Sequence, residues 1–185
     1  MSTIAALATS QTTPEAASVL AAVESSLGVV PNLFRVAANS PAALNAVAGL
    51  NGSLAKGKLR AKVREAIALT VAQANGCDYC LSAHTALGKG AGLSESDIDA
   101  ARGANASDAH TNAILTLAAA IVRERGAVGA DAVAEARNAG VTDAEIVEIV
   151  AHVALNVFTN YLNLVAATDI DFPVVRASSL ETALA

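Results

Sequence analysis

Residues 59–87 of this chain, LRAKVREAIALTVAQANGCDYCLSAHTAL, contain two apolar segments separated by the dipeptide Asn75-Gly76. The first segment, from Leu59 to Ala74, is apolar on most of its circumference and long enough for a helix of about four turns. An Asn-Gly pair between two such segments is a strong turn signal. A second helix, from about Cys77 to Leu87, should therefore fold back against the first, and the stretch predicts an antiparallel helical hairpin.

Helix start signals recur along the rest of the chain, whereas strand signals are nearly absent. Thr13-Pro14 and Ser40-Pro41 each place a capping hydroxyl before a proline at the first helical position. They predict helices from residue 14 to about 27 and from residue 41 to about 54. The run from Ser94 to Asp97 resembles a capping box and predicts a short helix that ends near residue 102.

The composition favours the same fold class. Of the 185 residues, 54% are hydrophobic but only 3% are aromatic, and there is no Trp. The apolar content is therefore largely Ala, Val, Leu and Ile, a mixture that favours packed helices. We expect an all-α helical bundle that forms a single domain over residues 1–185, with a core from about 14 to 175 and a loose C-terminal tail after Pro173.

Charge and hydropathy limit the partners. The net charge is -5 and the pI about 5.1, and no basic cluster interleaves with aromatic residues, so no nucleic acid partner is expected. The N-terminus lacks a basic region followed by an unbroken apolar run, so we expect no secretory signal and a cytoplasmic location. The mean hydropathy of +0.46 suggests that other copies of the chain cover apolar surface, which predicts a homo-oligomer.

One segment has to be distinguished from a membrane span. Ile149 to Thr168 runs for 20 residues without a formal charge, which is the length of a transmembrane helix. The segment also carries His152, Asn156, Asn160 and Asn163, which would be costly against lipid. We therefore expect a buried helix in a soluble protein and no membrane partner.

These four polar residues form a stripe, at i, i+4, i+8 and i+11 of the expected helix. Such a stripe could line an active pocket or a subunit contact. Hydrogen bonding between the helices of a buried bundle is the interpretation that we favour. The third histidine, His110, is expected in a loop beside Asp108, with no catalytic role.

The only two cysteines of the chain lie with a histidine at the start of the second hairpin helix. Cys77, Cys80 and His84 follow one another at steps of three and four, so on a helix they share one face. The positive end of the helix dipole favours a thiolate near the turn, which points to Cys77. His84, one turn from Cys80, could take the proton of Cys80 or hydrogen-bond its thiolate.

Glu65 is expected to join this group. If the two helices fold back antiparallel, the rise of about 1.5 Å per residue brings Glu65 within about one turn of His84. Its helical neighbours Leu69 and Ala72 are apolar, and a carboxylate in such surroundings either ionises reluctantly or pairs with a base. Glu65, His84 and Cys80 would then form a proton relay.

The second half of the chain repeats the pattern of the first. Gly140 to Ile146, GVTDAEI, matches Gly92 to Ile98, GLSESDI, in character at each position, which sets an offset of 48 residues (140 minus 92). A long helix from Thr111 to Arg125 and a helix from Ala130 to Asn138 are expected before the second copy of this motif. The fold should therefore contain a degenerate helix-turn-helix repeat.

The repeat does not extend to the chemistry. At the offset of 48, the positions of the two cysteines and the histidine are taken by Arg125, Val128 and Ala132. The second copy is thus expected to keep the scaffold and to lack the reactive side chains.

A set of short motifs is spread over about residues 14–175. They are VPNLF (30–34), SPA (40–42), REAIAL (64–69), NGCDYC (75–80), AHT (83–85), NVFTNY (156–161) and DIDFP (169–173). The most specific feature is a Glu twelve residues before a Cys-x-x-Cys pair, with a His four residues after the second Cys. Together they resemble the alkylhydroperoxidase D-like, or carboxymuconolactone decarboxylase, superfamily, and in particular its peroxidase-related branch.

This resemblance implies an all-helical fold that assembles as trimers or hexamers, with peroxidase activity and neither cofactor nor metal. By position, Cys80 resembles the peroxidatic thiol, Cys77 the resolving thiol, and Glu65 and His84 the relay. The implied substrate is hydrogen peroxide or a small organic hydroperoxide, and an external dithiol would reduce the disulfide. The best-described members carry a second His directly before the second Cys, where this chain has Tyr79, a far weaker base.

Other interpretations of these residues stay open at this point. The cysteines could be small buried hydrophobes. Cys77, Cys80 and His84, with or without Glu65, could hold zinc, although the second Cys-x-x-Cys of a usual structural site is absent. A decarboxylase of the same superfamily would not need the cysteine pair. A redox-responsive or structural oligomer would use the pair without turnover.

Overall fold

The computed structural model describes residues 2–177, so most of the expected loose tail lies outside the described residues. Within residues 2–177 the chain is helical and contains no strand, as predicted. The elements are the 3-10 helix η1 (Thr9–Gln11) and the α-helices α1 (Pro14–Leu27), α2 (Asn32–Ala37), α3 (Pro41–Leu54), α4 (Ala61–Ala74), α5 (Asp78–Gly90), α6 (Glu95–Arg102), α7 (Ala109–Arg123), α8 (Gly129–Asn138) and α9 (Asp143–Ala166).

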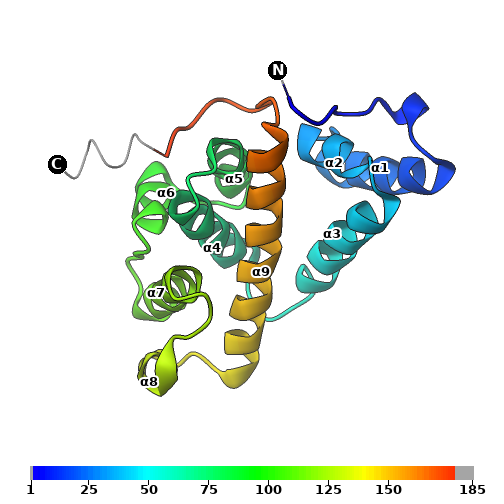
Figure 1. Ribbon diagram of the computed structural model, residues 1–185. Helices are drawn as coiled ribbons and strands as arrows, with labels where there is room; N and C mark the ends of the chain where they lie inside the picture. Colours follow the sequence, from blue (N-terminus) through cyan, green and yellow to red (C-terminus); the bar gives the residue numbers. More distant parts are fainter. Residues whose placement is uncertain (1, 178–185) are drawn as a thin grey trace.

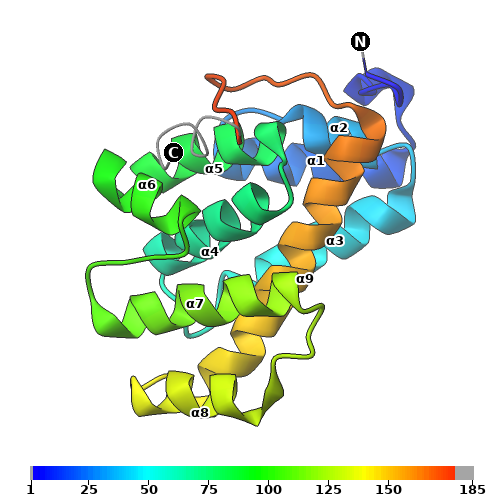
Figure 2. The same cartoon turned by 60° about the vertical axis from the view of Figure 1, so that its left-hand side comes forward.

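The long helix α9 is the element around which the others are arranged. Helices α1, α2 and α3 lie on one side of it and α4 to α8 on the other (Figure 1), and Figure 2 shows the arrangement from a second direction. Helix α4 is the centre of the larger group, because it packs against α5, α6, α7 and α9. All of its residues from 66 to 72 are buried. The predicted hairpin of α4 and α5 therefore lies in the core of the molecule.

The predicted starts of α1 and α3 are confirmed, and the side chains explain them. Thr13 accepts a hydrogen bond from the N–H of Ala16 at 3.2 Å, directly before the helix that Pro14 opens. Ser40 accepts one from the N–H of Ala43 at 3.3 Å. Each hydroxyl satisfies a backbone donor that has no partner inside the helix, which fixes where the helix begins.

Helix α5 is longer than predicted. It continues through Gly88 to Gly90 instead of ending near Leu87. Gly88 serves packing rather than termination, because a Cβ there would lie 2.9 Å from Cδ1 of Leu93. The chain turns only at Gly92, whose φ of +93° is in the left-handed region that favours glycine. The sequence pattern identified the glycines but not which of them ends the helix.

The internal repeat is present in the structure as two helical hairpins, α4–α5 and α7–α8, each followed by a capped helix start. Ser94 and Asp97 form a capping box at α6. Thr142 and Glu145, each 48 residues further on, form one at the start of α9. The cap positions predicted from the sequence are therefore correct in both copies.

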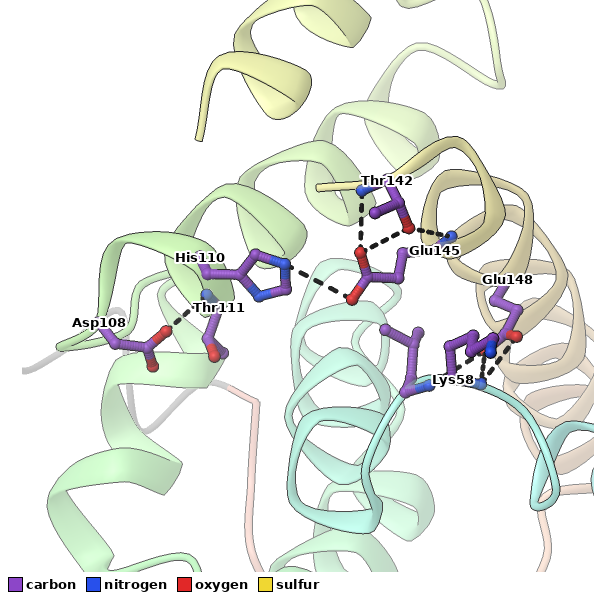
Figure 3. A network of polar contacts seen from close by, with 8 residues as sticks. Lys58, Asp108, His110, Thr111, Thr142, Glu145 and Glu148 are labelled. Atoms are coloured by element: carbon purple, nitrogen blue, oxygen red, sulfur yellow. Dashed lines mark hydrogen bonds and ion pairs between the residues drawn. The ribbon is translucent and has the colours of Figure 1, made fainter. Parts of the chain in front are cut away.

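Each copy also ties its capping box to the first helix of its hairpin. In the first copy, Nζ of Lys62 lies 3.2 Å from the carboxylate of Asp97. In the second, Nε2 of His110 lies 3.5 Å from the carboxylate of Glu145 (Figure 3). The prediction of a loop for His110 is wrong: Asp108 caps α7, and His110 lies in its first turn. His110 therefore has a structural partner, at the position that corresponds to Lys62.

Glu148 of α9 holds the loop that leads into α4 (Figure 3). Its carboxylate accepts hydrogen bonds from the N–H of Lys58 at 2.8 Å and from the N–H of Leu59 at 3.1 Å. This loop is thus tied to α9, and α4 begins at Ala61, after Arg60 in an extended conformation, rather than at Leu59, where the apolar pattern starts.

Helix α9 is long and apolar enough, by length and composition, to cross a membrane. Half of its most apolar window is nevertheless buried inside the fold, against α3, α4 and α7 among others. The buried face includes His152, Asn156, Asn160 and Asn163. Polar side chains buried against neighbouring helices are typical of a core helix, which agrees with the preference drawn from the sequence.

Candidate active site

The turn between α4 and α5 sets the position of the cysteines. Gly76 has a φ of +64°, which lets the chain reverse directly after α4. The N–H of Cys77 then bonds to the carbonyl of Ala72 at 3.0 Å, and α5 begins at Asp78. Cys77 is thus the N-cap residue, and its Sγ accepts a hydrogen bond from the N–H of Cys80 at 3.3 Å.

The two cysteines are a buried pair of free thiols. Cys77 is 1% exposed and Cys80 is 3% exposed. The thiol of Cys77 donates a hydrogen bond to Sγ of Cys80, and the two sulfur atoms are 2.6 Å apart. A pair this close needs little movement to form a disulfide. Cys77 and Cys80 therefore lie side by side at the start of α5, as their spacing predicts.

The surroundings give the two thiols different acidities. The pKa of Cys80 is lowered to about 7, chiefly by the hydrogen bond from Cys77; burial opposes this, and the charge of His84 supports it. The pKa of Cys77 is raised, because its proton is held in the bond to Cys80 and because the site is buried. The thiolate of the pair therefore resides on Cys80, although the helix dipole alone favours Cys77.

Glu65 and His84 lie together beside this pair. Oε2 of Glu65, on α4, is 2.8 Å from Nδ1 of His84, on α5, and each side chain is 22% exposed. Burial alone would lower the pKa of His84, but the charge and hydrogen bond of Glu65, with a contribution from Cys80, outweigh burial and raise it. The imidazolium form of His84 is thus favoured between a carboxylate and a thiolate.

Two asparagines of α9 also act on the dithiol. Nδ2 of Asn163 donates to Sγ of Cys80 at 3.3 Å, and Oδ1 of Asn160 accepts from Nδ2 of Asn75 at 2.9 Å. Both amides help to lower the pKa of Cys80. The Asn75–Asn160 bond is the interhelical kind that the sequence analysis favoured, but the contact of Asn163 with the thiol was missed. The signal was the helical spacing of polar residues in an otherwise apolar segment.

A cavity of about 300 Å³ opens beside Glu65 and His84. His152 and Asn156, from the same polar stripe of α9, also line it. The remaining wall is largely apolar and includes Leu33, Phe34, Val47, Leu87, Leu155 and Phe172. A mostly apolar cavity with a few polar groups at one place is typical of a site for a small organic molecule. We refer to it as the relay cavity.

Tyr79, which replaces the histidine of the best-described relatives, is fully engaged in structural contacts. Its hydroxyl donates to Oδ1 of Asp171 at 2.8 Å and accepts from the N–H of Leu33 at 3.1 Å. Its ring packs edge-on against Phe172, with the ring centroids 5.9 Å apart. Burial raises the pKa of Tyr79, so the phenol stays neutral and is not available as a base. Tyr79 therefore joins α5 to α2 and to the segment after α9.

The arrangement gives no support to the zinc alternative. Within residues 2–177, no group of three or more His, Cys, Asp and Glu side chains is placed to hold a metal ion. Nδ1 of His84 is engaged with Glu65, and the two cysteines are hydrogen-bonded to each other. In this arrangement Glu65 is paired with His84 and Cys77 with Cys80.

Comparisons with known proteins address the resemblance found in the sequence. Residues 41–124, from α3 through α7, match the model of the carboxymuconolactone decarboxylase family. Comparison with curated protein sequences gives no match. Among solved structures, an uncharacterized peroxidase-related protein from Ralstonia eutropha JMP134, described as an alkylhydroperoxidase AhpD core, has a TM-score of 0.83 at 22% identity, over 92% of both chains.

Two further solved structures share the fold. A peroxidase-related protein from Silicibacter sp. TM1040 has a TM-score of 0.76 at 24% identity, over 89% of this chain and 90% of that one. The debrominase Bmp8, solved in complex with 2,3,4-tribromopyrrole, has a TM-score of 0.74 at 21% identity, over 93% of this chain and 92% of that one. The family match supports the resemblance over residues 41–124, and the likenesses to solved structures confirm the all-helical, single-domain fold.

Proposed function

We propose that this chain, a member of the carboxymuconolactone decarboxylase superfamily with the alkylhydroperoxidase D-like fold, is a thiol-dependent peroxidase. Its substrates are hydrogen peroxide or small organic hydroperoxides. One observation carries the proposal: Sγ of Cys80 accepts hydrogen bonds from the thiol of Cys77 and the amide of Asn163, next to His84. This environment keeps a thiolate at neutral pH, and the thiolate is the form of cysteine that attacks peroxides.

In the first step, the thiolate of Cys80 attacks the terminal oxygen of the peroxide. The O–O bond breaks as the S–O bond forms, so sulfur loses two electrons and the peroxide gains them. The departing alkoxide takes a proton from His84, which Glu65 orients through the 2.8 Å contact. The products of this step are an alcohol, or water from hydrogen peroxide, and a sulfenic acid on Cys80.

In the second step, Cys77 attacks the sulfur of the sulfenic acid. Its own proton leaves with the hydroxyl group as water, and a disulfide joins Cys77 to Cys80. The short distance between the two sulfurs supports this step. An external dithiol then reduces the disulfide by exchange and becomes oxidised in turn.

The relay cavity supports a preference for organic hydroperoxides. Its apolar wall can take a hydrocarbon group while the peroxide end meets His84 and Glu65. The debrominase Bmp8 shares the fold and was solved with a small bromopyrrole, and the apolar lining of the relay cavity could also take a molecule of that kind. Reductive removal of bromide by the same dithiol is therefore the alternative substrate reaction to test.

A single-turnover experiment tests the proposal. One equivalent of cumene hydroperoxide is added to the reduced protein without any reductant. We expect one equivalent of cumyl alcohol, and mass spectrometry should find two hydrogens lost from the peptide with Cys77 and Cys80. The Cys77→Ser variant should stop at a sulfenic acid on Cys80 that dimedone traps. Unconsumed peroxide and unmodified cysteines would contradict the proposal.

Multiple-turnover assays separate the remaining alternatives. With excess dithiothreitol a peroxidase consumes many equivalents of peroxide, whereas a redox-responsive or structural oligomer oxidises once and stops. Release of bromide from 2,3,4-tribromopyrrole without any peroxide consumption would favour debromination. Turnover of a carboxymuconolactone by a variant without both cysteines would favour a decarboxylase.

We also propose that the chain forms a homo-oligomer, with trimers or hexamers as the resemblance implies. Large apolar side chains stay exposed along one helix, α9: Val147, Val150, Phe158, Tyr161 and Val165. The most exposed of them, Val165, is 70% exposed. Association of several copies through this row would remove its apolar surface from water, which favours an oligomer. Light scattering of the wild-type protein should give a multiple of the chain mass. Val165→Glu should lower the measured mass, whereas Val29→Glu should not. A monomeric wild-type protein would contradict the proposal.

A cytoplasmic location is proposed on chemical grounds. The dithiol works as a peroxidase only where external thiols keep it reduced, which is typical of the cytosol. Fractionation of cells that make the protein should recover it with cytosolic markers. Recovery in an oxidising compartment would argue against this.

A further inference from the structure

A second hollow, distinct from the relay cavity, lies over Cys77. It has a volume of about 270 Å³ and is formed where the start of α5 meets the end of α9 and the segment that follows. Its wall includes Gly76, Cys77, Asn163, Ala167, Thr168 and Ile170. Among the described residues, Tyr79 is shared by the two hollows, and Cys80 lines neither of them.

The two hollows therefore share Tyr79 but differ in the reactive groups that line them, and only the second is lined by a cysteine. The relay cavity reaches Glu65 and His84, which serve the sulfur that attacks peroxide. The second hollow reaches Cys77, which is 1% exposed and has no place in the wall of the relay cavity. The ring of Tyr79, held by Asp171 and Phe172, stands between them.

We propose that the second hollow is the site where the external thiol reductant enters and attacks Sγ of Cys77 in the oxidised pair. The proposal rests on the peroxidase function proposed above and adds to it a separate site for the second substrate. We call this hollow the reductant site. Peroxide and reductant then use different openings and do not compete for one.

The exchange chemistry agrees with this direction of attack. The thiolate of the reductant forms a bond to Sγ of Cys77, the Cys77–Cys80 bond breaks, and Cys80 leaves with the electron pair. Exchange is faster when the departing thiolate is the more stable one. Cys80 is that sulfur, because it accepts the hydrogen bond of Asn163 and lies beside His84. A second thiol of the reductant then displaces Cys77, and both cysteines are reduced.

Two residues of the wall each carry a buried polar atom without a partner, which favours a bound group that can reach them. Oδ1 of Asn163 and Oγ1 of Thr168 have no hydrogen-bond partner within the part of the chain that the structure describes. Both residues line the reductant site, and they are only 3% and 7% exposed. A buried polar atom without a partner is unfavourable, so a bound group that reaches and pairs with these atoms is favoured.

The lining also indicates the charge of the reductant. Apart from Asp78, the side chains that line the described hollow are uncharged, and none of them is cationic. Asp78 lies at the start of α5 and is paired with Arg176 at 2.8 Å. A neutral thiol with an apolar arm fits this surface better than an anionic one, which would find no cation in the wall.

The test isolates the reductive half of the cycle. Diamide converts the cysteine pair of the wild-type protein to the disulfide, so no peroxidase activity is needed. Acid quenching and mass spectrometry then measure how fast the disulfide is reduced. N-acetylcysteinamide serves as the neutral thiol and N-acetylcysteine as the anionic one, and the two reduction rates are compared per thiolate. We expect the neutral thiol to react about fivefold faster, the effect of roughly one unfavourable charge contact.

Ala167→Lys and Ala167→Glu form a matched pair, because Ala167 is exposed in the wall of the reductant site and both new side chains meet the same left-handed backbone, with a φ of +46°. The Lys variant should speed reduction by N-acetylcysteine about fivefold and the Glu variant should slow it about as much. Neither should change the rate of oxidation by hydrogen peroxide. Leu87→Trp, in the relay cavity, should do the reverse: slow oxidation by cumene hydroperoxide and leave reduction unchanged.

Mapping the mixed disulfide decides which sulfur is attacked. Rapid acidification during reduction should trap the thiol adduct on Cys77. An adduct on Cys80, or equal rates for both Ala167 variants with the anionic thiol, would overturn the reductant site. A protein that is reduced as described but never oxidised by peroxide would instead refute the proposed function, so the two failures are distinguishable.

Discussion

The two helical hairpins of this molecule share a scaffold but differ in chemistry. Ser94 and Thr142 cap corresponding helices, and the contacts of Lys62 with Asp97 and of His110 with Glu145 are equivalent. These elements fix how the first helix of each hairpin meets the helix that follows the hairpin. They lie away from the cysteines, so the scaffold can persist without the reactive groups.

The difference lies in the side chains between the two helices of each hairpin. In the first hairpin Glu65 and His84 meet there. In the second, at the offset of 48, the positions belong to Ala113 and Ala132, and a groove of about 210 Å³ lined by both lies between α7 and α8. Helix α8 also begins only at Gly129, so the counterparts of the cysteines precede the helix. A capped hairpin is therefore compatible with either set of side chains, and the helix that starts directly at the turn brings the two thiols together.

The largest effect is expected from removing the attacking sulfur. Cys80→Ser should lower peroxide turnover by about three orders of magnitude or more, because a hydroxyl is not ionised at neutral pH. Val128→Ser makes the same side chain at the corresponding place of the second hairpin and should leave turnover unchanged. Peroxide consumption with dithiothreitol as donor measures both. Full activity of Cys80→Ser would refute the assignment of chemistry to the first hairpin.

The next effect concerns the ion pair between the helices. Glu65→Gln removes the charge that raises the pKa of His84, so less imidazolium remains to protonate the leaving group and to stabilise the thiolate. We expect kcat/KM at pH 7 to fall about a hundredfold. Ala113→Gln, the matched change in the second hairpin, should have little effect. An unchanged pH profile for Glu65→Gln would show that the pair has no part in proton transfer.

The fold was largely predictable because its signals are local. The Asn75-Gly76 turn and the hydroxyl caps before Pro14 and Pro41 depend on residues that are neighbours in the chain, and each element is present in the structure. The short η1 and the true end of α5 were missed. The end of α5 depends on the contact of Gly88 with Leu93, which the helical pattern does not reveal.

The site was only partly predictable, for the same reason. The proximity of Cys77, Cys80, His84 and Glu65 follows from helical spacing and one reversal of the chain. The contact of Asn163 with Cys80 joins residues that are 83 positions apart, across a packing of α5 on α9 that no local pattern specifies. The two hollows are likewise products of long-range packing, so their lining could not be derived from the sequence.

The polarisation of the dithiol gives a prediction of intermediate size. Because the pKa of Cys80 is lowered to about 7, the thiolate forms as pH rises through about 7 and is lost below it. Asn163→Leu removes a hydrogen bond to the charged sulfur, worth about 1.5–3 kcal/mol, and should raise that pKa by about one to two units. Thiolate absorbance at 240 nm, titrated from pH 5 to 10, measures the shift. The same pKa in both proteins would remove Asn163 from the site.

The smallest effects should be equal in the two hairpins, because they concern the shared scaffold. Ser94→Ala and Thr142→Ala each remove the side chain that caps a helix, so each should lower the free energy of unfolding by about 1 kcal/mol. Both caps lie outside the dithiol and its two hollows, so peroxide turnover should stay at the wild-type level. Urea titration measures the first quantity, with Ser53→Ala, an exposed position of α3 without a capping role, as the control. A loss of activity in Ser94→Ala alone would mean that the cap of α6 also supports peroxide turnover. The scaffolds of the two hairpins would then not be equivalent.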